Sequence, residues 1–455
     1  MIKLKILAVA VLALTVAAAC GGGADATATT EAGVLTPQAI EGTDREPTPT
    51  PPIPTSTPIP APGVEIPTAV SFIPELEDIA YGYAETIVTD FPERKSTTAG
   101  ELATAEFIAG ELRSFGYDAE VQGFELQVVD DAEPWLRVTS EEDRVIESRF
   151  LFGTGFGDVE GRLEHAGLGM EADFPEEGMD GAVALVERGA INFETKATNA
   201  IAAGALAVII YNNEPGNFSG TVQSEGRAPV LSVSQEDGQA LLATMETGKV
   251  TVRVRVLTLD RESRNVVATK EGTIPGAPSI VVGAHYEGDD LSVAANNNAA
   301  GTGALLAVAH ALKDDEFPIN VTFVAFGASD LGLIGAQHFV SGLLAEDTVN
   351  VPLMINLDVV GSGERAIVAG DPVIQLETLR LGTELGVMVS PGNEPEGGIS
   401  DHAVFEAVGI PSVFFFGDDI SRVNTPEDTL EFVDAALVGD VANLVAALVR
   451  SMAGS

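Results

Sequence analysis

The chain has 455 residues, enough for two or three domains, and carries 68 acidic against 24 basic side chains, a formal net charge of −44. So acidic a surface repels nucleic acid and anionic lipid headgroups, which argues against either as a binding partner. Cys20 is the only cysteine, so a disulfide within the chain is excluded.

The N-terminus predicts export. Two lysines precede an apolar run over residues 6–19, which is too short for a membrane span and ends in small residues before Cys20. Residues 1–20 resemble a bacterial lipoprotein signal, which implies an extracytoplasmic protein held to the cell membrane only by a lipid on Cys20; a plain secretion signal is the alternative. Residues 21–68 are rich in Thr, Ala and Pro, which predicts a disordered linker, with a ligand for a proline-binding module as the weaker alternative.

From residue 69 the chain alternates between predicted helices and predicted strands. Helices are expected at 99–117, 299–313, 330–345, 372–386, 400–408 and 432–452, and strands at 118–128, 279–285, 320–327, 352–358 and 411–417. Most of these strands are continuous apolar runs, and helices separate them. This pattern predicts an α/β fold with a mostly parallel sheet sandwiched by helices.

A different pattern interrupts this alternation. The stretch "GAVALVERGAINFETKATNAIAAGALAVIIYNN" at 181–213 resembles the protease-associated (PA) domain, and 228–242 resembles the closing portion of that module. The resemblance implies a β-rich insert that covers the active-site side of a peptidase or receptor and carries no catalytic residues. We place the insert at 141–258, between a first part of the peptidase-like domain at 69–140 and its main part at 259–455.

Chemistry-bearing side chains follow the predicted strands. His285 and Asp358 each end an apolar run, and Asp330 follows another. Side chains at the carboxyl ends of parallel strands face the ligand crevice of an α/β fold. Imidazole and carboxylate groups delivered there are the ligands that a metal-dependent hydrolase requires.

Six motifs occur in the order found in one enzyme family. The segments "GAHYE", "AANNNAAG", "GASD", "NLD", "SDHAVFEAVGIPSVFF" and "NTPEDT" resemble those of di-zinc aminopeptidases of the aminopeptidase S and aminopeptidase Y type, metallopeptidase family twenty-eight. The resemblance covers 75–135 and 260–452 and implies the zinc-exopeptidase (phosphorylase/hydrolase-like) fold. It places the metal ligands at His285, Asn297, Asp330, Asp358 and Asn424, the general base at Ser329, an acidic residue that orients the first ligand at Glu287, and the substrate pocket beside Asp401 and His402.

Of the five metal-ligand positions and the general-base position, four depart from the family's residues. Asn297 stands in place of the aspartate that bridges the two zinc ions, and Asn424 stands in place of the last histidine ligand. Asp330 replaces a glutamate ligand, and Ser329 replaces the glutamate that acts as the general base. An amide oxygen is a weak, neutral ligand, and a serine cannot take a proton from metal-bound water at neutral pH. We therefore expect no metal or one weakly bound metal, and a non-catalytic homologue that binds peptides or another extracytoplasmic protein.

Alternatives to this interpretation stay open. The chain can be an active metallo-aminopeptidase that releases N-terminal amino acids from peptides at an altered metal site, or a surface module whose cleft has no ligand. If Asp289 and Asp290 approach the cluster, the donor set becomes rich in oxygen, and calcium is then the alternative ion. A serine hydrolase is disfavoured because Ser329 lacks the G-x-S-x-G setting.

Overall fold

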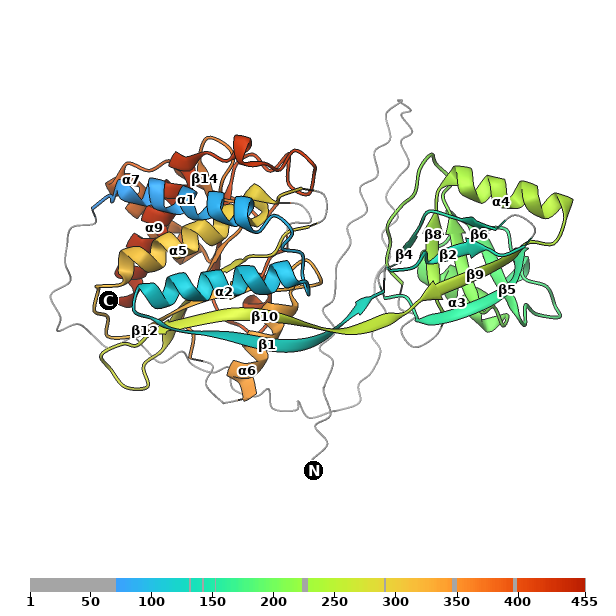
Figure 1. Ribbon diagram of the computed structural model, residues 1–455, viewed down its shortest axis with the longest axis horizontal. Helices are drawn as coiled ribbons and strands as arrows, with labels where there is room; N and C mark the ends of the chain where they lie inside the picture. The colour runs from blue at the N-terminus through green and yellow to red at the C-terminus, as the bar shows by residue number, and fades with distance from the viewer. Residues whose placement is uncertain are drawn as a thin grey trace, which may run out of the picture. The chain divides into compact units, whose positions relative to one another are not determined.

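Figure 1 shows the computed structural model, which describes residues 71–454 apart from 131, 141–142, 152, 223–227, 290–291, 346–349 and 396–398. The predicted signal at 1–20 with Cys20, the predicted linker at 21–68, and Asp290 therefore lie outside the described residues.

The first sheet has eight strands, and the predicted apolar runs form its centre. In spatial order the strands are β1 (Asp118–Val129), β10 (Thr258–Lys270), β12 (Asn320–Phe326), β11 (Ser279–His285), β13 (Met354–Leu357), β16 (Ser412–Gly417), β14 (Ala366–Gly370) and β15 (Val389–Pro391). The central strands β12, β11, β13 and β16 pair in parallel, whereas β1, β10 and β14 contribute antiparallel pairs. The mostly parallel α/β sheet is confirmed.

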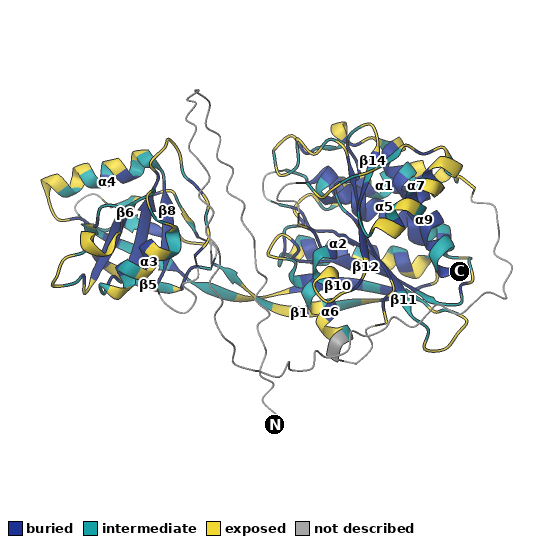
Figure 2. Cartoon of the chain, turned by 180° about the vertical axis from the view of Figure 1, so that it is seen from behind, coloured by how far each residue is buried: buried dark blue, intermediate teal, exposed yellow. Residues whose placement is uncertain are grey.

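Helices cover both faces of this sheet (Figure 1). One face packs against α1 (Glu75–Asp90), α2 (Ala99–Ser114), α5 (Gly301–Leu312), α7 (Pro372–Leu385) and α9 (Ala435–Ala453), and the other against α6 (Ile334–Ala345) and α8 (His402–Glu406). α9 is long and apolar enough to cross a membrane by length and composition, but 67% of its most apolar window is buried. Its buried surface, dark blue in Figure 2, identifies α9 as a core helix of this domain.

Two helices differ from their predicted form. α1 was not predicted, although four of its buried side chains, Leu76, Ala80, Ala84 and Ile87, recur at helical spacing. α6 begins at Ile334 because the residues before it form a turn: Gly332 and Leu333 have φ of 109° and 61°, outside the helical region.

The second sheet belongs to the inserted segment. Its strands in spatial order are β3 (Arg144–Val145), β2 (Leu136–Val138), β9 (Thr251–Val256), β5 (Gly157–His165), β6 (Ala182–Glu187), β7 (Ala207–Tyr211), β8 (Val230–Val233) and β4 (Ser148–Phe150). α3 (Phe193–Ala202) and α4 (Gln235–Thr247) pack against opposite faces. Because β2 pairs with β9, the insert's sheet begins at Leu136, before the predicted boundary at 141.

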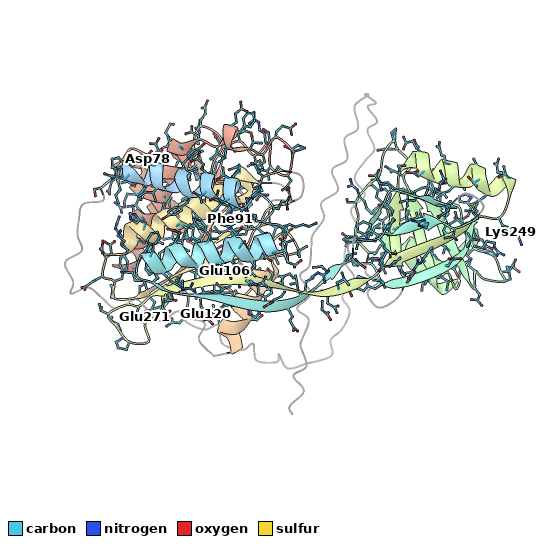
Figure 3. All side chains as sticks on the ribbon, viewed as in Figure 1. Asp78, Phe91, Glu106, Glu120, Lys249 and Glu271 are labelled. Atoms are coloured by element: carbon cyan, nitrogen blue, oxygen red, sulfur yellow. The ribbon has the colours of Figure 1, made fainter. Side chains whose placement is uncertain are left out.

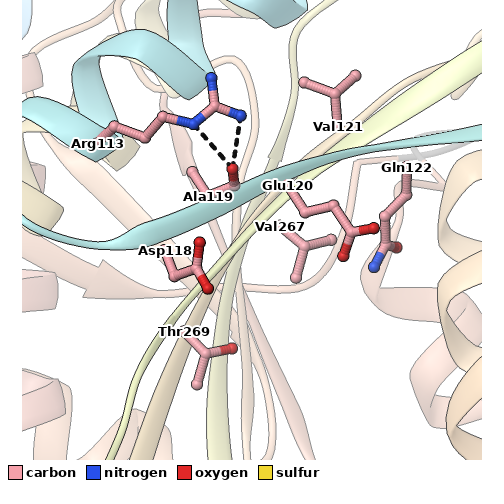
Figure 4. A pocket seen from close by; sticks show the side chains of 8 residues that line it. All are labelled: Arg113, Asp118, Ala119, Glu120, Val121, Gln122, Val267 and Thr269. Carbon is pink, nitrogen blue, oxygen red and sulfur yellow. Dashed lines mark hydrogen bonds between the residues drawn. The ribbon is translucent and has the colours of Figure 1, made fainter.

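A long antiparallel ribbon, β1 with β10, carries the chain into the insert and back. β1 is also the outer strand of the first sheet, so half of its backbone groups face away from β10. Figure 4 shows the residues that line a pocket at this edge, where Nε and Nη2 of the exposed Arg113 donate hydrogen bonds to the carbonyl oxygen of Ala119 at 3.0 and 2.6 Å. This arginine satisfies an edge carbonyl that no strand covers.

The acidic excess is spread over the surface. Asp78, Glu106, Glu120 and Glu271, all labelled in Figure 3, are exposed and belong to four different segments. Such a distribution is that of a solvated surface and does not mark a binding site.

Candidate active site

The predicted site residues lie at the carboxyl ends of the central parallel strands. His285 is the last residue of β11, Ser329 and Asp330 follow β12, Asp358 follows β13 directly, and Asn424 lies in the connection between β16 and α9. This is the edge at which open parallel sheets bind their ligands.

The backbone around these residues is unusual. Ala294, Ala328, Val359 and Asn424 all have positive φ, between 49° and 58°, although none is a glycine. A non-glycine residue in this region costs of order 1–3 kcal/mol and persists only where the surrounding structure enforces it. The fold therefore still imposes a specialised backbone at this edge, even though four side chains depart from the family's residues.

Asp428 holds the turn that presents Asn297. This turn, η2 (Ala295–Ala300), is irregular, and the two carboxylate oxygens of Asp428 accept hydrogen bonds from the backbone N–H groups of Asn296 at 2.7 Å and Asn297 at 3.0 Å. Asp428 was not predicted as a site residue, although it belongs to the "NTPEDT" segment, so the motif carried the signal.

Arg94 supports the segment that leads into the same turn. Its side chain is fully buried and donates hydrogen bonds to the backbone oxygens of Tyr286 at 2.9 Å, Val293 at 2.8 Å and Ala294 at 2.5 Å. Burial lowers the pKa of Arg94 to about 10, so the guanidinium remains charged at neutral pH. Nothing in the sequence around Arg94 signals this role, because its partners are backbone atoms.

His285 is the centre of the cluster. Its Nε2 lies 3.0 Å from Oδ1 of Asn297 and 3.2 Å from Oδ1 of Asp358, and its Nδ1 lies 3.5 Å from Oε1 of Glu287. Burial lowers the pKa of His285, but the carboxylates of Asp358 and Glu287 raise it by more, so the net pKa is well above its usual value. The structure thus brings His285, Asn297 and Asp358 together, with Glu287 on the other side of the ring.

Asn297 and Asn424 bond directly to each other. Nδ2 of Asn297 donates a hydrogen bond to Oδ1 of Asn424 at 2.8 Å. An amide can therefore link His285 to Asn424, because one end accepts and the other donates, whereas a carboxylate could only accept. This hydrogen-bonded chain occupies the place where the family resemblance puts a carboxylate between two metal ions.

Ser329 faces a buried acid. Its Oγ donates a hydrogen bond to Oδ2 of Asp401 at 3.2 Å, and its backbone N–H, like that of Asp330, donates to Oε1 of the fully buried Glu287. Burial and the carboxylates of Glu287 and Asp358 raise the pKa of Asp401 to about 7, against the opposing effect of His285. Asp401 thus lies beside Ser329, the position at which the family resemblance places the general base.

Asp330 is turned to a different partner. Ser96, in the connection between α1 and α2, donates a hydrogen bond to Oδ1 of Asp330. Among the described contacts, Asp330 has no hydrogen bond to Asn297 or Asn424, the two residues with which it would share a metal.

The two predicted pocket residues have separate environments. Asp401 contacts Ser329, as described, and the residue before it, Ser400, donates a hydrogen bond to Oδ2 of Asp358 at 2.8 Å. His402 instead lies 2.9 Å, through Nε2, from Oε1 of Glu394. The structure therefore connects Asp401 to the cluster around His285 and directs the imidazole of His402 elsewhere.

The donor set fits a pair of zinc ions poorly. One position would have His285, Asn297 and Asp358, of which only Asp358 carries a negative charge. The other position would have the carboxylate of Asp330 and two amides that are already bonded to each other. No negatively charged ligand between the two dications would offset their mutual repulsion. Among the described residues the arrangement also supplies few of calcium's six to eight oxygen ligands, because Asp289 accepts a hydrogen bond from the backbone N–H of Ser292 within its own turn. Asp290 lies outside these residues.

Buried carboxyls predict an unusual pH dependence of stability. The pKa of Asp401 is raised to about 7, and burial likewise raises the pKa of Glu101, on α2, to about 7. In the unfolded chain their pKa values are near 3.8 and 4.5. Their protonated forms therefore favour folding below about pH 4, and this contribution is lost as the pH rises to about 7.

We expect the unfolding free energy to be roughly 2–4 kcal/mol higher at pH 5 than at pH 8. The raised pKa of His285 acts in the same direction, and the lowered pKa of Asp358 matters only below about pH 4. Urea unfolding at both pH values measures the difference, and Asp401→Asn should reduce it. Equal stability at the two pH values, or an unchanged difference in the variant, would contradict the prediction.

Comparisons with known proteins identify the family. The model of peptidase family M28 matches residues 265–449, and that of the PA domain matches 159–241. Aminopeptidase YwaD of Bacillus subtilis (strain 168) is 32% identical over 406 residues, which cover 85% of this chain and 87% of that protein. Leucine aminopeptidase 2 of Arthroderma otae is 30% identical over 307 residues, which cover 66% of this chain and 60% of that protein.

Solved structures agree with these matches. BSAP, a zinc aminopeptidase from Bacillus subtilis, superposes with a TM-score of 0.68 at 27% identity and covers 83% of this chain and 95% of its own. An aminopeptidase from Aneurinibacillus sp. strain AM-1 superposes with a TM-score of 0.66 at 28% identity, and the match covers 83% of this chain and 94% of that protein. With the ordered motifs at the strand ends of the first sheet and the second sheet inserted between β1 and β10, these matches show that the chain belongs to peptidase family M28 and carries a PA domain.

Proposed function

We propose that this member of the M28 family binds peptides or another extracytoplasmic protein at the bacterial cell surface and does not hydrolyse peptide bonds with a zinc pair. The observation that carries the proposal is the hydrogen-bonded chain from His285 through Asn297 to Asn424. It satisfies by direct hydrogen bonds three of the five side chains at the family's ligand positions.

The replaced base supports the same conclusion. Ser329 stands where the family resemblance places the glutamate that activates water, and its hydroxyl already donates to Asp401. A hydroxyl does not accept a proton at neutral pH, and loss of a positioned general base alone typically costs about 10²–10⁴ in rate. Loss of the metal that would activate the water adds to this cost.

The surroundings of the cluster suit a peptide. Leu331 directly follows Asp330, and Ile399 directly precedes Ser400, yet both of these large apolar side chains are exposed, Ile399 to 62%. Apolar side chains beside an acidic centre suit a peptide segment with an apolar side chain and a free amino group.

The proposal includes attachment to the membrane through a lipid on Cys20 and no contact with nucleic acid. It rests on the signal-like segment at 1–20 and on the net charge of −44.

A metallo-aminopeptidase with an altered site is the second candidate. The relatives YwaD and BSAP favour it, and so does the convergence of His285, Asn297 and Asp358, which leaves three donors around one position. In that case Asp401, 3.2 Å from the hydroxyl of Ser329, is the carboxyl placed to replace the base.

Metal content and turnover separate the two candidates. The full-length chain is dialysed against trace zinc, its metal is measured by elemental mass spectrometry, and hydrolysis of leucine p-nitroanilide and of short peptides is followed. We expect no turnover and no zinc that depends on Asp358, together with a higher melting temperature in the presence of peptides. Hydrolysis, with near-stoichiometric zinc that is lost in Asp358→Asn, would overturn the proposal in favour of the second candidate.

A further inference from the structure

We propose that Asn265, on β10, is a positioning residue of the active site, because its side chain closes the 327–335 loop, which carries Ser329, Asp330 and Leu331 and connects β12 to the start of α6. Asn265 is fully buried and lies outside the six motifs that predicted the site. None of the described hydrogen bonds of its side chain goes to a side chain of the active-site cluster. Its effect on the cleft therefore passes through the loop.

A single amide holds both ends of the 327–335 loop. Oδ1 of Asn265 accepts a hydrogen bond from the backbone N–H of Gly327 at 3.2 Å, and Nδ2 donates one to the backbone oxygen of Gly335 at 2.9 Å. The backbone N–H of Gly335 also donates to the backbone oxygen of Gly327 at 3.1 Å. An amide suits this position because it accepts at one end and donates at the other.

The two loop ends pack against β10 without space for a side chain. A Cβ atom on Gly335 would collide with the backbone oxygen of Gly327 and with Oδ1 of Asn265. A Cβ atom on Gly327 would collide with the backbone oxygen of Arg264 and with the hydroxyl of Ser263. β10 therefore determines where the 327–335 loop begins and where it ends.

The middle of the loop contacts the centre of the site. The backbone N–H groups of Ser329 and Asp330 donate to Oε1 of Glu287 at 2.7 and 3.1 Å, and the same oxygen lies 3.5 Å from Nδ1 of His285. Ala328 has a φ of 53°, a conformation that persists only where the surrounding structure enforces it. A loop released at its ends would therefore move both donors, together with the general-base position, relative to Glu287.

The loop also carries an apolar side chain of the proposed peptide site. Leu331 directly follows Asp330 and is exposed. A change in the position of the loop should therefore change the affinity for a peptide as well. The effect on peptide affinity rests on the proposed function, whereas the effect on the loop itself does not.

Asn265→Leu removes both hydrogen bonds with little change in volume, and Asn443→Leu is the matched control. Asn443 is buried on α9, and its Oδ1 accepts a hydrogen bond from the backbone N–H of Ile73 at 2.7 Å. Its Nδ2 donates to the backbone oxygens of Ile73 at 3.1 Å and Gly439 at 3.0 Å. Both asparagines thus bridge backbone groups inside the same domain, but only Asn265 contacts the 327–335 loop.

Two measurements on the full-length chain test the proposal. Hydrogen exchange of the Ser329 and Asp330 amides, with the amides of β11 as the internal reference, reports on the loop. Isothermal titration calorimetry with the tripeptide Leu-Gly-Gly reports on the cleft. We expect Asn265→Leu to accelerate exchange of the two loop amides at least about tenfold and to weaken binding of Leu-Gly-Gly at least about tenfold.

Asn443→Leu should change neither quantity, although it should lower the melting temperature as Asn265→Leu does. Asn265→Asp keeps the acceptor for Gly327 and loses the donor to Gly335, so it should accelerate exchange of the loop amides by a smaller factor. This variant carries the test if Asn265→Leu does not fold.

Loop exchange that is unchanged in both Asn265 variants, or that rises equally in Asn443→Leu, would contradict the proposal. Unchanged affinity for Leu-Gly-Gly in Asn265→Leu would also contradict it, because a residue that only stabilises the fold would give that result. Failure of the wild type to bind Leu-Gly-Gly would count against the proposed function instead, and the exchange of the loop amides would then decide whether Asn265 positions the loop.

Discussion

Restoring four side chains should give this chain tightly bound zinc and aminopeptidase activity. The variant combines Asn297→Asp, Ser329→Glu, Asp330→Glu and Asn424→His. The first and last changes break the amide-to-amide hydrogen bond and supply a charged bridge and an imidazole ligand. The middle two supply the base and a carboxylate with one more methylene than the one now bonded to Ser96. We expect the variant to hydrolyse leucine p-nitroanilide at least about 10²–10⁴-fold faster than the wild type.

Variants that restore only some of these side chains separate the effect of the base position from that of the ligand positions. Ser329→Glu alone should give no activity and should lower stability, because it adds a carboxylate beside the buried Glu287 and Asp401 with no metal to offset the repulsion. Asn297→Asp with Asn424→His should bind zinc without turnover, because the base is still missing. Asp358→Asn in the fourfold variant should abolish its activity. A folded fourfold variant that holds neither zinc nor activity would contradict the prediction that these four positions decide zinc binding and turnover.

The central part of the fold could be predicted because its strands are buried on both faces. β11, β12 and β16 are continuous apolar runs that no other element type explains as simply. The periphery gives weaker signals. Two of the five buried side chains of α1 are alanines, which give a weak apolar signal. β10 contains the charged stretch "DRESR" because this part of the strand belongs to the ribbon that leads to the insert.

The sequence predicted where the site residues lie, but it did not predict which partner each side chain faces. Motif order placed His285, Ser329 and Asp358 at neighbouring strand ends, and the structure brings these strand ends together. Whether a carboxylate faces its expected partner depends on residues far away in the chain. Asp330 bonds to Ser96, 234 positions earlier, and neither side chain indicates the other in the sequence.

The supporting residues were missed for a related reason. Arg94 binds three backbone oxygens, and a backbone carbonyl leaves no residue type to recognise. Asp428 likewise binds backbone N–H groups. Such contacts fix the shape of a site without any pairing of side chains, so a motif can retain them after its chemistry has changed.

Arg94→Met should therefore lower the unfolding free energy of the peptidase-like domain by about 3–5 kcal/mol. The change leaves the carbonyl oxygens of Tyr286, Val293 and Ala294 buried without their donor, and it removes the positive charge whose field acts on Glu287 and Asp428. Urea unfolding followed by circular dichroism measures the loss. Because the PA domain can unfold separately, the transition of the peptidase-like domain is assigned by hydrogen exchange of its own peptides.

Arg113→Met is the matched control, since this guanidinium also donates to a backbone carbonyl but is exposed at the edge of β1 (Figure 4). Water can replace its hydrogen bonds, so we expect a loss below about 1 kcal/mol. Arg94→Lys, which keeps the charge with fewer donors, should fall between the two. Exchange of the Asn296 and Asn297 amides should rise in Arg94→Met and stay unchanged in Arg113→Met, because only Arg94 fixes the turn that Asp428 holds. Equal losses in the two methionine variants would mean that the buried arginine does not support the site in the way its contacts indicate.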